Sequence, residues 1–248
     1  MIFFDIDGTL LDHKGAELEG IKAFYKANGF DKICSFDEFQ NAWIQYSDKN
    51  FEKFLKKECS FEEQRAMRII DVYNEFGKEI EYDISLVKFS DYLKAYEEAW
   101  KSYDDVIECL DSLKGYKLGI ISNGDYNQQV SKLKKMKIDK YFCDIVTAGE
   151  VGYAKPDSKI FEIACERNGV AIKEAYYIGD NVKTDIIPTN KIGMRGILID
   201  RNKKINREEN IKRIYSLRDV KKCFLIYWHF KKNLVSLTYT GKRWNLFK

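Results

Sequence analysis

Three observations predict an α/β protein with a parallel sheet and an inserted all-helical unit. A short apolar run at residues 2–4 is typical of a buried strand. Residues 16–101 then show helical periodicity and no strand pattern. From residue 103 onward, short apolar runs alternate with helical stretches. Strands that alternate with helices form parallel sheets with right-handed crossovers.

The inserted segment is expected to hold four helices. The first covers residues 17–28, where apolar side chains recur at helical spacing before a glycine. The next two, at 35–57 and 60–77, each open with a capping box, in which a serine and a glutamate three residues later satisfy free backbone N–H groups. A fourth helix is expected at 85–101. Four helices with no strand between them predict a separate helical unit at residues 14–102.

The second part of the chain supplies the other strands of the sheet. The segment at 196–199 is expected to be the last of them. The predicted strands are 117–122, 142–147, 175–178 and 196–199, and the predicted helices are 104–113, 127–136, 158–167 and a turn at 183–190.

Two carboxylates directly follow the first strand. Asp5 and Asp7 are two residues apart, so they share one face of the extended chain while Ile6 points to the other. Gly8 then lets the chain turn. Two acids this close repel each other, and Mg²⁺, which prefers oxygen ligands, is the cation that best offsets them. Taken alone, the pattern also fits an Asp-Gly turn that caps a strand.

Polar side chains also follow three later strands. Ser122 and Asn123 offer hydrogen-bond donors to a phosphate, although an ordinary Asn-Gly turn has the same pattern. Lys155 precedes a Pro-Asp helix start and is free to face an anion, and Asp180 and Asp185 follow the strand before the last. The carboxyl ends of parallel strands meet at one edge of the sheet. Four acids at that edge require a divalent cation and a lysine to offset their repulsion.

These segments together resemble the four motifs of the haloacid dehalogenase (HAD) superfamily. In order they are Asp5-Ile-Asp7-Gly8-Thr9, Ser122-Asn123, Lys155-Pro156 and Gly179-Asp180 with Asp185. The resemblance implies a Rossmann-like parallel sheet core at residues 1–13 and 103–200. It also implies a helical cap at 14–102 and leaves 201–248 as a C-terminal extension. Glu63-Gln64-Arg65 is similar to cap residues of noncanonical pyrimidine nucleotidases and N-acylneuraminate-9-phosphatases.

The resemblance also implies a role for each motif residue. Asp5 would be the nucleophile that forms an aspartyl-phosphate, and Asp7 would act as general acid and then general base. The phosphate would be bound by Ser122, Asn123 and Lys155. Mg²⁺ would be bound by Asp5, the Asp7 backbone carbonyl and Asp180, with Asp185 either as a further ligand or as support for the ligands. The implied function is hydrolysis of a small phosphorylated metabolite.

Three other functions remain open. A 2-haloacid dehalogenase is disfavoured because a halide leaves without a proton, and the dehalogenases of the family lack the acid found here at Asp7. A phosphomutase shares all four motifs. A binding protein without catalysis would use the C-terminal tail instead. The sequence does not choose among a nucleotide, a sugar phosphate and phosphoglycolate as substrate.

The charge distribution separates the tail from the rest of the chain. Residues 221–248 hold seven basic residues and no acid. The whole chain carries +3, so the other 220 residues carry −4, and nucleic acid is not the first choice of partner. Neither a signal peptide nor a membrane helix is expected. Six cysteines without a Cys-x-x-Cys pair are typical of a cytoplasmic protein, expected here as a monomer or homodimer. His13 is interpreted as a surface loop residue.

Overall fold

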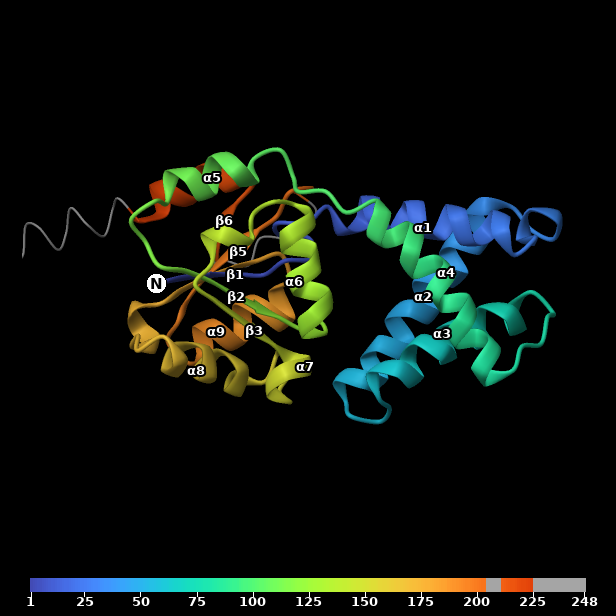
Figure 1. The fold of residues 1–248 in the computed structure, drawn as a ribbon. Coiled ribbons are helices and arrows are strands. Elements are labelled where there is room, and N and C mark those ends of the chain that lie inside the picture. The colour runs from blue at the N-terminus through green and yellow to red at the C-terminus, as the bar shows by residue number, and fades with distance from the viewer. Residues whose placement is uncertain (204–210, 225–248) are drawn as a thin grey trace, which may run out of the picture.

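The computed structural model describes residues 1–203 and 211–224, and the predictions for residues 225–248 lie outside the described residues. The fold is built on a six-stranded parallel sheet in the order β3-β2-β1-β4-β5-β6 (Figure 1). The predicted α/β fold class is confirmed. The strands are β1 (Ile2–Phe4), β2 (Leu118–Ser122), β3 (Asp144–Thr147), β4 (Tyr176–Gly179), β5 (Arg195–Ile199) and β6 (Lys212–Ile214).

The sixth strand corrects the prediction that the segment at 196–199 ends the sheet. β6 pairs with β5 in parallel, with Ile199 opposite Ile214. The strand is short and two of its three residues are basic, so it lacks the apolar run by which a buried strand is recognised. The residues that follow β6 are attached to the rest of the fold through Asp105. Its carboxylate accepts hydrogen bonds from the Ser216 hydroxyl and the Leu217 N–H.

Side chains alternate between the two faces of the sheet and join two apolar clusters. Phe3 packs in one cluster with Ile160 and Phe161 of α8, whereas Phe4 joins the other with Leu110 of α5 and Leu133 of α6. Both sheet faces are therefore covered, as expected for a parallel sheet. The helices of this part are α5 (Val106–Ser112), α6 (Tyr126–Lys135), α7 (Ala148–Val151), α8 (Ser158–Arg167) and α9 (Ile187–Lys191), with a π-helical turn η4 (Val182–Ile186).

All four helices predicted between the first two strands are present. They are α1 (His13–Ala27), α2 (Phe36–Leu55), α3 (Phe61–Glu75) and α4 (Tyr82–Glu98). Both predicted capping boxes form, at Ser35 and at Ser60. We call residues 14–102 the helical insert; its helices lie to one side of the sheet (Figure 1).

Aromatic side chains form the centre of the insert. The Phe24 ring lies 5.0 Å from that of Trp43, and the Phe30 ring lies 4.7 Å from that of Phe39. Two connecting segments join the insert to the sheet. They are hydrogen-bonded to each other, because the Asp12 N–H donates to the Lys101 carbonyl. No helix in the described part of the chain combines the length and apolar character needed to cross a membrane.

Candidate active site

The strand order brings the predicted residues together. β1 lies between β2 and β4, the point at which the order of strands along the chain reverses direction. Ligands of open α/β sheets bind beyond the carboxyl ends of the strands at such a point. Asp5 follows β1, Ser122 ends β2 and Asp180 follows β4. Residues more than 100 positions apart in the chain therefore meet at one edge of the sheet.

Three carboxylates form a cluster at this edge. Asp5, Asp180 and Asp185 each offer an oxygen, and these atoms all lie within 4.8 Å of one another. Burial raises the pKa of Asp5 well above its usual range, and burial together with the charge of Asp185 raises the pKa of Asp180 to about 7. Gly8 has φ +85°, and a Cβ at this position would collide with the Asp180 carboxylate. Glycine is therefore required here by both its backbone conformation and the close approach.

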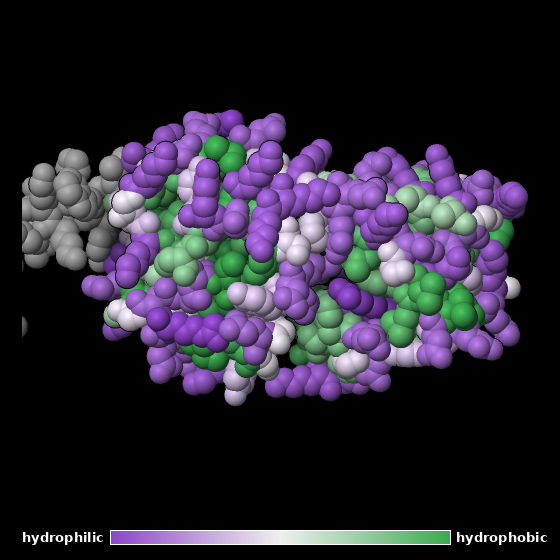
Figure 2. All heavy atoms as spheres, in the orientation of Figure 1, coloured by the Kyte–Doolittle hydropathy of each residue, from purple (hydrophilic) through white to green (hydrophobic). Residues whose placement is uncertain are grey.

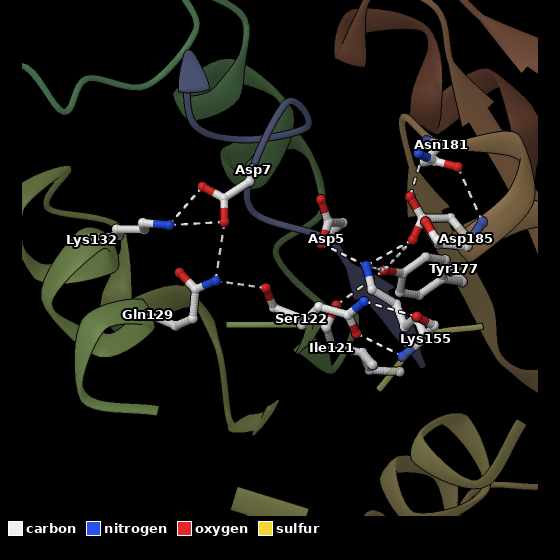
Figure 3. Close-up of polar contacts among 12 residues, drawn as sticks. Asp5, Asp7, Ile121, Ser122, Gln129, Lys132, Lys155, Tyr177, Asn181 and Asp185 are labelled. Carbon is white, nitrogen blue, oxygen red and sulfur yellow. Dashed lines mark hydrogen bonds and ion pairs between the residues drawn. The ribbon is translucent and has the colours of Figure 1, made fainter. Parts of the chain in front are cut away.

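Lys155 neutralises part of this charge. Its Nζ donates to Asp5 Oδ1 at 2.8 Å, to Asp185 Oδ1 at 2.7 Å and to the Tyr177 hydroxyl at 2.8 Å (Figure 3). The lysine is 4% exposed. Burial acts to lower its pKa, but Asp185 and Asp5 raise it above the ordinary value, so the side chain stays charged.

Asn123 holds the backbone of Lys155. The Asn123 Nδ2 donates to the Lys155 carbonyl at 2.9 Å, and the Lys155 N–H donates to Asn123 Oδ1 at 2.6 Å. Both polar atoms of the Asn123 side chain thus contact protein. This side chain couples the end of β2 to the lysine, and the phosphate-binding role predicted for Asn123 stays a prediction.

The donor set fits Mg²⁺. Three carboxylates within 4.8 Å are hard oxygen ligands, and the single Lys155 ammonium leaves their charge only partly offset. Among the described residues the Asp7 side chain does not belong to this cluster. The family resemblance predicts that Asp7 contributes its backbone carbonyl, and this stays a prediction.

The Asp7 carboxylate is instead held by helix α6. Lys132 Nζ lies 2.7 and 2.8 Å from its two oxygens, and Gln129 Nε2 donates to Oδ2 at 3.1 Å. Gln129 Nε2 also donates to the Ser122 hydroxyl at 2.7 Å, which links the first two motifs (Figure 3). Burial acts to raise the pKa of Asp7, but the charges of Lys132 and His13 lower it to about 2.

A cavity of about 780 Å³ opens between this edge of the sheet and the insert. The drawn face of the molecule is hollowed where the two parts meet (Figure 2). On one side the cavity is lined by the predicted residues Asp5, Asp7, Ser122, Asn123, Lys155, Asp180 and Asp185, all seven of the candidate site. On the other side it is lined by residues of the insert helices. Its size is that of a site for a small molecule.

Sequence reasoning missed four residues of this site. Gln129 and Lys132 lie about one turn apart on the helix predicted at 127–136, so they share one face of that helix. This spacing was the signal in the sequence that the two side chains contact the same group. Tyr177 lies on a predicted strand and carried no polar signal of its own. The interpretation of His13 as a surface loop residue is wrong: it begins α1, lines the cavity and bonds the Tyr96 hydroxyl at 2.9 Å.

The sequence as a whole assigns the family. The sequence model of the haloacid dehalogenase-like hydrolases matches residues 2–199. The chain belongs to this family. A glyceraldehyde 3-phosphate phosphatase from Methanothermobacter thermautotrophicus is 29% identical over 211 residues, which are 80% of this chain and 84% of the relative. An (S)-2-haloacid dehalogenase from Burkholderia cepacia is 32% identical over 111 residues, or 44% of this chain and 47% of the relative.

Solved structures show the same fold. The HAD hydrolase YfnB from Bacillus subtilis, whose crystal structure contains magnesium, superposes with a TM-score of 0.76. The similarity covers 90% of this chain and 96% of that one at 21% sequence identity. The Rossmann-like HAD architecture predicted from the sequence motifs is therefore confirmed.

Proposed function

We propose that this protein is a Mg²⁺-dependent phosphatase that hydrolyses phosphomonoesters of small metabolites through a covalent intermediate on Asp5. The observation that carries the proposal is the Asp7 carboxylate. It lines the cavity outside the carboxylate cluster, it is fixed by Lys132 and Gln129, and Gln129 links it to Ser122. An alkoxide leaving group needs a proton and a halide does not, so this acid favours phosphatase over dehalogenase chemistry.

In the first step a carboxylate oxygen of Asp5 attacks phosphorus and the bond to the leaving oxygen breaks. Ser122 and Lys155 line the cavity next to Asp5 and stabilise the charge on the transferring phosphoryl oxygens. Asp7 gives its proton to the leaving oxygen. The negative charge of a bound phosphomonoester opposes the effect of Lys132 on Asp7 and favours the protonated form that this step uses.

In the second step water attacks the aspartyl-phosphate, and Asp7 accepts its proton. Lys132 stabilises the deprotonated carboxylate that this step needs, which agrees with the pKa of about 2 for Asp7 in the absence of substrate. The phosphorus–Asp5 bond breaks, phosphate is released and the Asp5 carboxylate is restored. One residue thus serves as acid and then as base.

Asp5, Asp180, Asp185 and the Asp7 backbone carbonyl would hold Mg²⁺ in this reaction. The bound cation would neutralise the carboxylate cluster and the charge that builds up on the phosphoryl group. The helical insert acts as a cap that covers the cavity and excludes bulk water, because its helices form the wall opposite the acids.

The first test is hydrolysis of p-nitrophenyl phosphate in Mg²⁺ and in EDTA, followed by a panel that contains glyceraldehyde 3-phosphate. Wild-type turnover should require Mg²⁺, and Asp5→Asn should lower kcat by at least about 10⁴-fold because the nucleophile is lost. Release of halide from 2-chloropropionate is measured in parallel. Halide release without phosphate hydrolysis, in folded protein with Mg²⁺, would falsify the phosphatase proposal.

A further inference from the structure

Two arginines of the insert face the cavity and have no carboxylate partner among the residues that the structure describes. Arg65 and Arg68 both lie on α3, and both line the cavity that contains Asp5 and Asp7. Neither forms an ion pair within residues 1–203 and 211–224. Other arginines of the described chain do have acid partners: Arg167 pairs with Glu150, Arg201 with Asp105, Arg213 with Asp200 and Arg218 with Glu108.

Arg68 is the more buried of the two, at 8% exposed. Its Nη2 donates to the Gln64 Oε1 at 3.2 Å, and its buried Nε has no hydrogen-bond partner in the part of the chain that the structure describes. Glu17 and Asp48 act on it electrostatically, but both lie beyond ion-pair distance. A buried guanidinium with a neutral amide as its hydrogen-bond partner is rare, because a buried charge is costly unless it is paired.

Aromatic rings orient both guanidinium groups. Arg65 lies over the Phe61 ring at 4.4 Å and over the Phe89 ring at 5.1 Å, and Arg68 lies 5.4 Å from the Phe89 ring. These cation–π contacts hold the planar groups in place but leave N–H donors for another ligand. Burial lowers the pKa of Arg65, and its repulsion with Arg68 lowers it further. An anion bound near both guanidinium groups would offset both effects.

The lysines on the opposite wall are already neutralised. Lys155 is paired with Asp5 and Asp185, and Lys132 with Asp7. The wall at the sheet is therefore a site for one phosphoryl group with its cation, whereas the α3 wall has cationic donors in excess. A cavity of about 780 Å³ has room for a ligand that contacts both walls.

We propose that Arg65 and Arg68 bind a second anionic group of the substrate, a carboxylate or a second phosphate, while its phosphomonoester reacts at Asp5. This inference rests on the proposed phosphatase function and specifies its substrate class. Arginine binds carboxylates and phosphates through paired N–H donors, so either group satisfies the site.

The test compares substrates that differ only in the second charge. 3-Phosphoglycerate and glyceraldehyde 3-phosphate differ by a carboxylate in place of an aldehyde, and fructose 1,6-bisphosphate and fructose 6-phosphate differ by one phosphate. Wild-type protein in Mg²⁺ should favour the more charged member of at least one pair by about 10–100-fold in kcat/KM, the contribution of a charge-assisted hydrogen bond. The pair that shows the preference identifies the anion.

Variants assign the preference to the arginines. Arg68→Met and Arg65→Met keep an unbranched, flexible side chain but remove the guanidinium and its charge, and each should reduce that ratio of kcat/KM values about tenfold. Arg218→Met, an exposed arginine on the sheet side, serves as the matched control and should leave the ratio unchanged. Partial unfolding of a variant does not change this ratio of kcat/KM values, because it lowers the activity toward both substrates by the same factor.

Two failures are distinguishable. If p-nitrophenyl phosphate is hydrolysed but wild type shows no preference in either pair, the arginine inference is wrong and the phosphatase proposal stands. If no phosphate is hydrolysed, the phosphatase proposal fails. Calorimetry then measures how tightly wild type and Arg68→Met bind the same four compounds, which tests the arginines without any reaction. If wild type binds the two members of each pair with equal affinity, the proposed role of the arginines is wrong.

Discussion

Lys155 and Arg68 are two buried cations on opposite walls of one cavity, and their surroundings differ. Lys155 on the sheet side is 4% exposed and contacts two carboxylates and a tyrosine hydroxyl. Arg68 on the insert side is 8% exposed and contacts one amide and an aromatic ring. The lysine charge is compensated by two acids, whereas the arginine has no ion-pair partner in the described part of the chain.

Lys155 and Arg68 show that a buried positive charge can serve the fold or serve ligand binding. A paired cation supports the folded state even without a ligand, because its removal leaves buried acids uncompensated. An unpaired cation costs stability until a ligand supplies the opposite charge. The sheet side is therefore built to hold its acids, and the insert side to receive an anion. Four measurements of protein stability test this contrast, described from the largest expected effect to the smallest.

Lys155→Met should have the largest effect. It leaves Asp5 and Asp185 buried without their shared ammonium, and breaking a buried pair in this way costs about 3–5 kcal/mol. Urea unfolding without metal at pH 8 measures the loss. The exposed pair between Lys22 and Glu19 provides the control, since Lys22→Met should cost less than about 1 kcal/mol. A Lys155→Met loss no larger than that of Lys22→Met would contradict the structural role of the lysine.

Mg²⁺ should stabilise the sheet side by about 2.7 kcal/mol at a concentration 100 times its Kd. The effect should be larger at pH 8 than at pH 5. Burial and Asp185 raise the pKa of Asp180 from 3.8 to about 7, so the folded metal-free protein holds this proton while the unfolded chain has lost it. The contribution of Asp180 to stability therefore falls as the pH rises between these values, and metal binding replaces the proton.

Thermal unfolding with Mg²⁺ or EDTA at both pH values measures this effect. Asp180→Asn should reduce the Mg²⁺-dependent rise in Tm and its pH dependence. An unchanged rise in this variant would place the cation elsewhere in the molecule.

Ser60→Ala should destabilise the insert by about 1 kcal/mol, the usual effect of a lost N-cap. Ser60 accepts from the Glu63 N–H at the start of α3, the helix that carries both arginines. The change removes no charge from the cavity, so the preference for doubly anionic substrates should persist. Loss of that preference in Ser60→Ala would mean that helix stability, and not the arginine charge, controls it.

Arg68→Met should have the smallest effect, within about 1 kcal/mol of wild type or in the stabilising direction. No acid of the described residues loses its partner, and the Gln64 amide lies at the cavity, where water can replace the guanidinium. Urea unfolding of Arg68→Met and Lys155→Met under the same conditions compares their free energies of unfolding directly. A loss of 3 kcal/mol or more would show that Arg68 supports the fold as Lys155 does.

The family resemblance and the helix starts could be predicted from the sequence because both depend on short local patterns. The acids at Asp5 and Asp7 follow an apolar strand, and the boxes at Ser35 and Ser60 start helices, because each pattern acts over a few residues. The strand β6 was missed because pairing with β5 stabilises it without any apolar run of its own.

The sequence by itself determined the fold class, the four helices of the insert and the residues at the ends of the strands, since local periodicity and spacing encode them. Only the tertiary structure decided that Lys132 pairs with Asp7 and that Asn123 holds Lys155. It also decided that Arg65 and Arg68 face the same cavity with no acid partner among residues 1–203 and 211–224. Whether a charge is paired depends on residues distant in the chain, because electrostatic compensation follows distance in space and burial, neither of which can be read from position in the sequence.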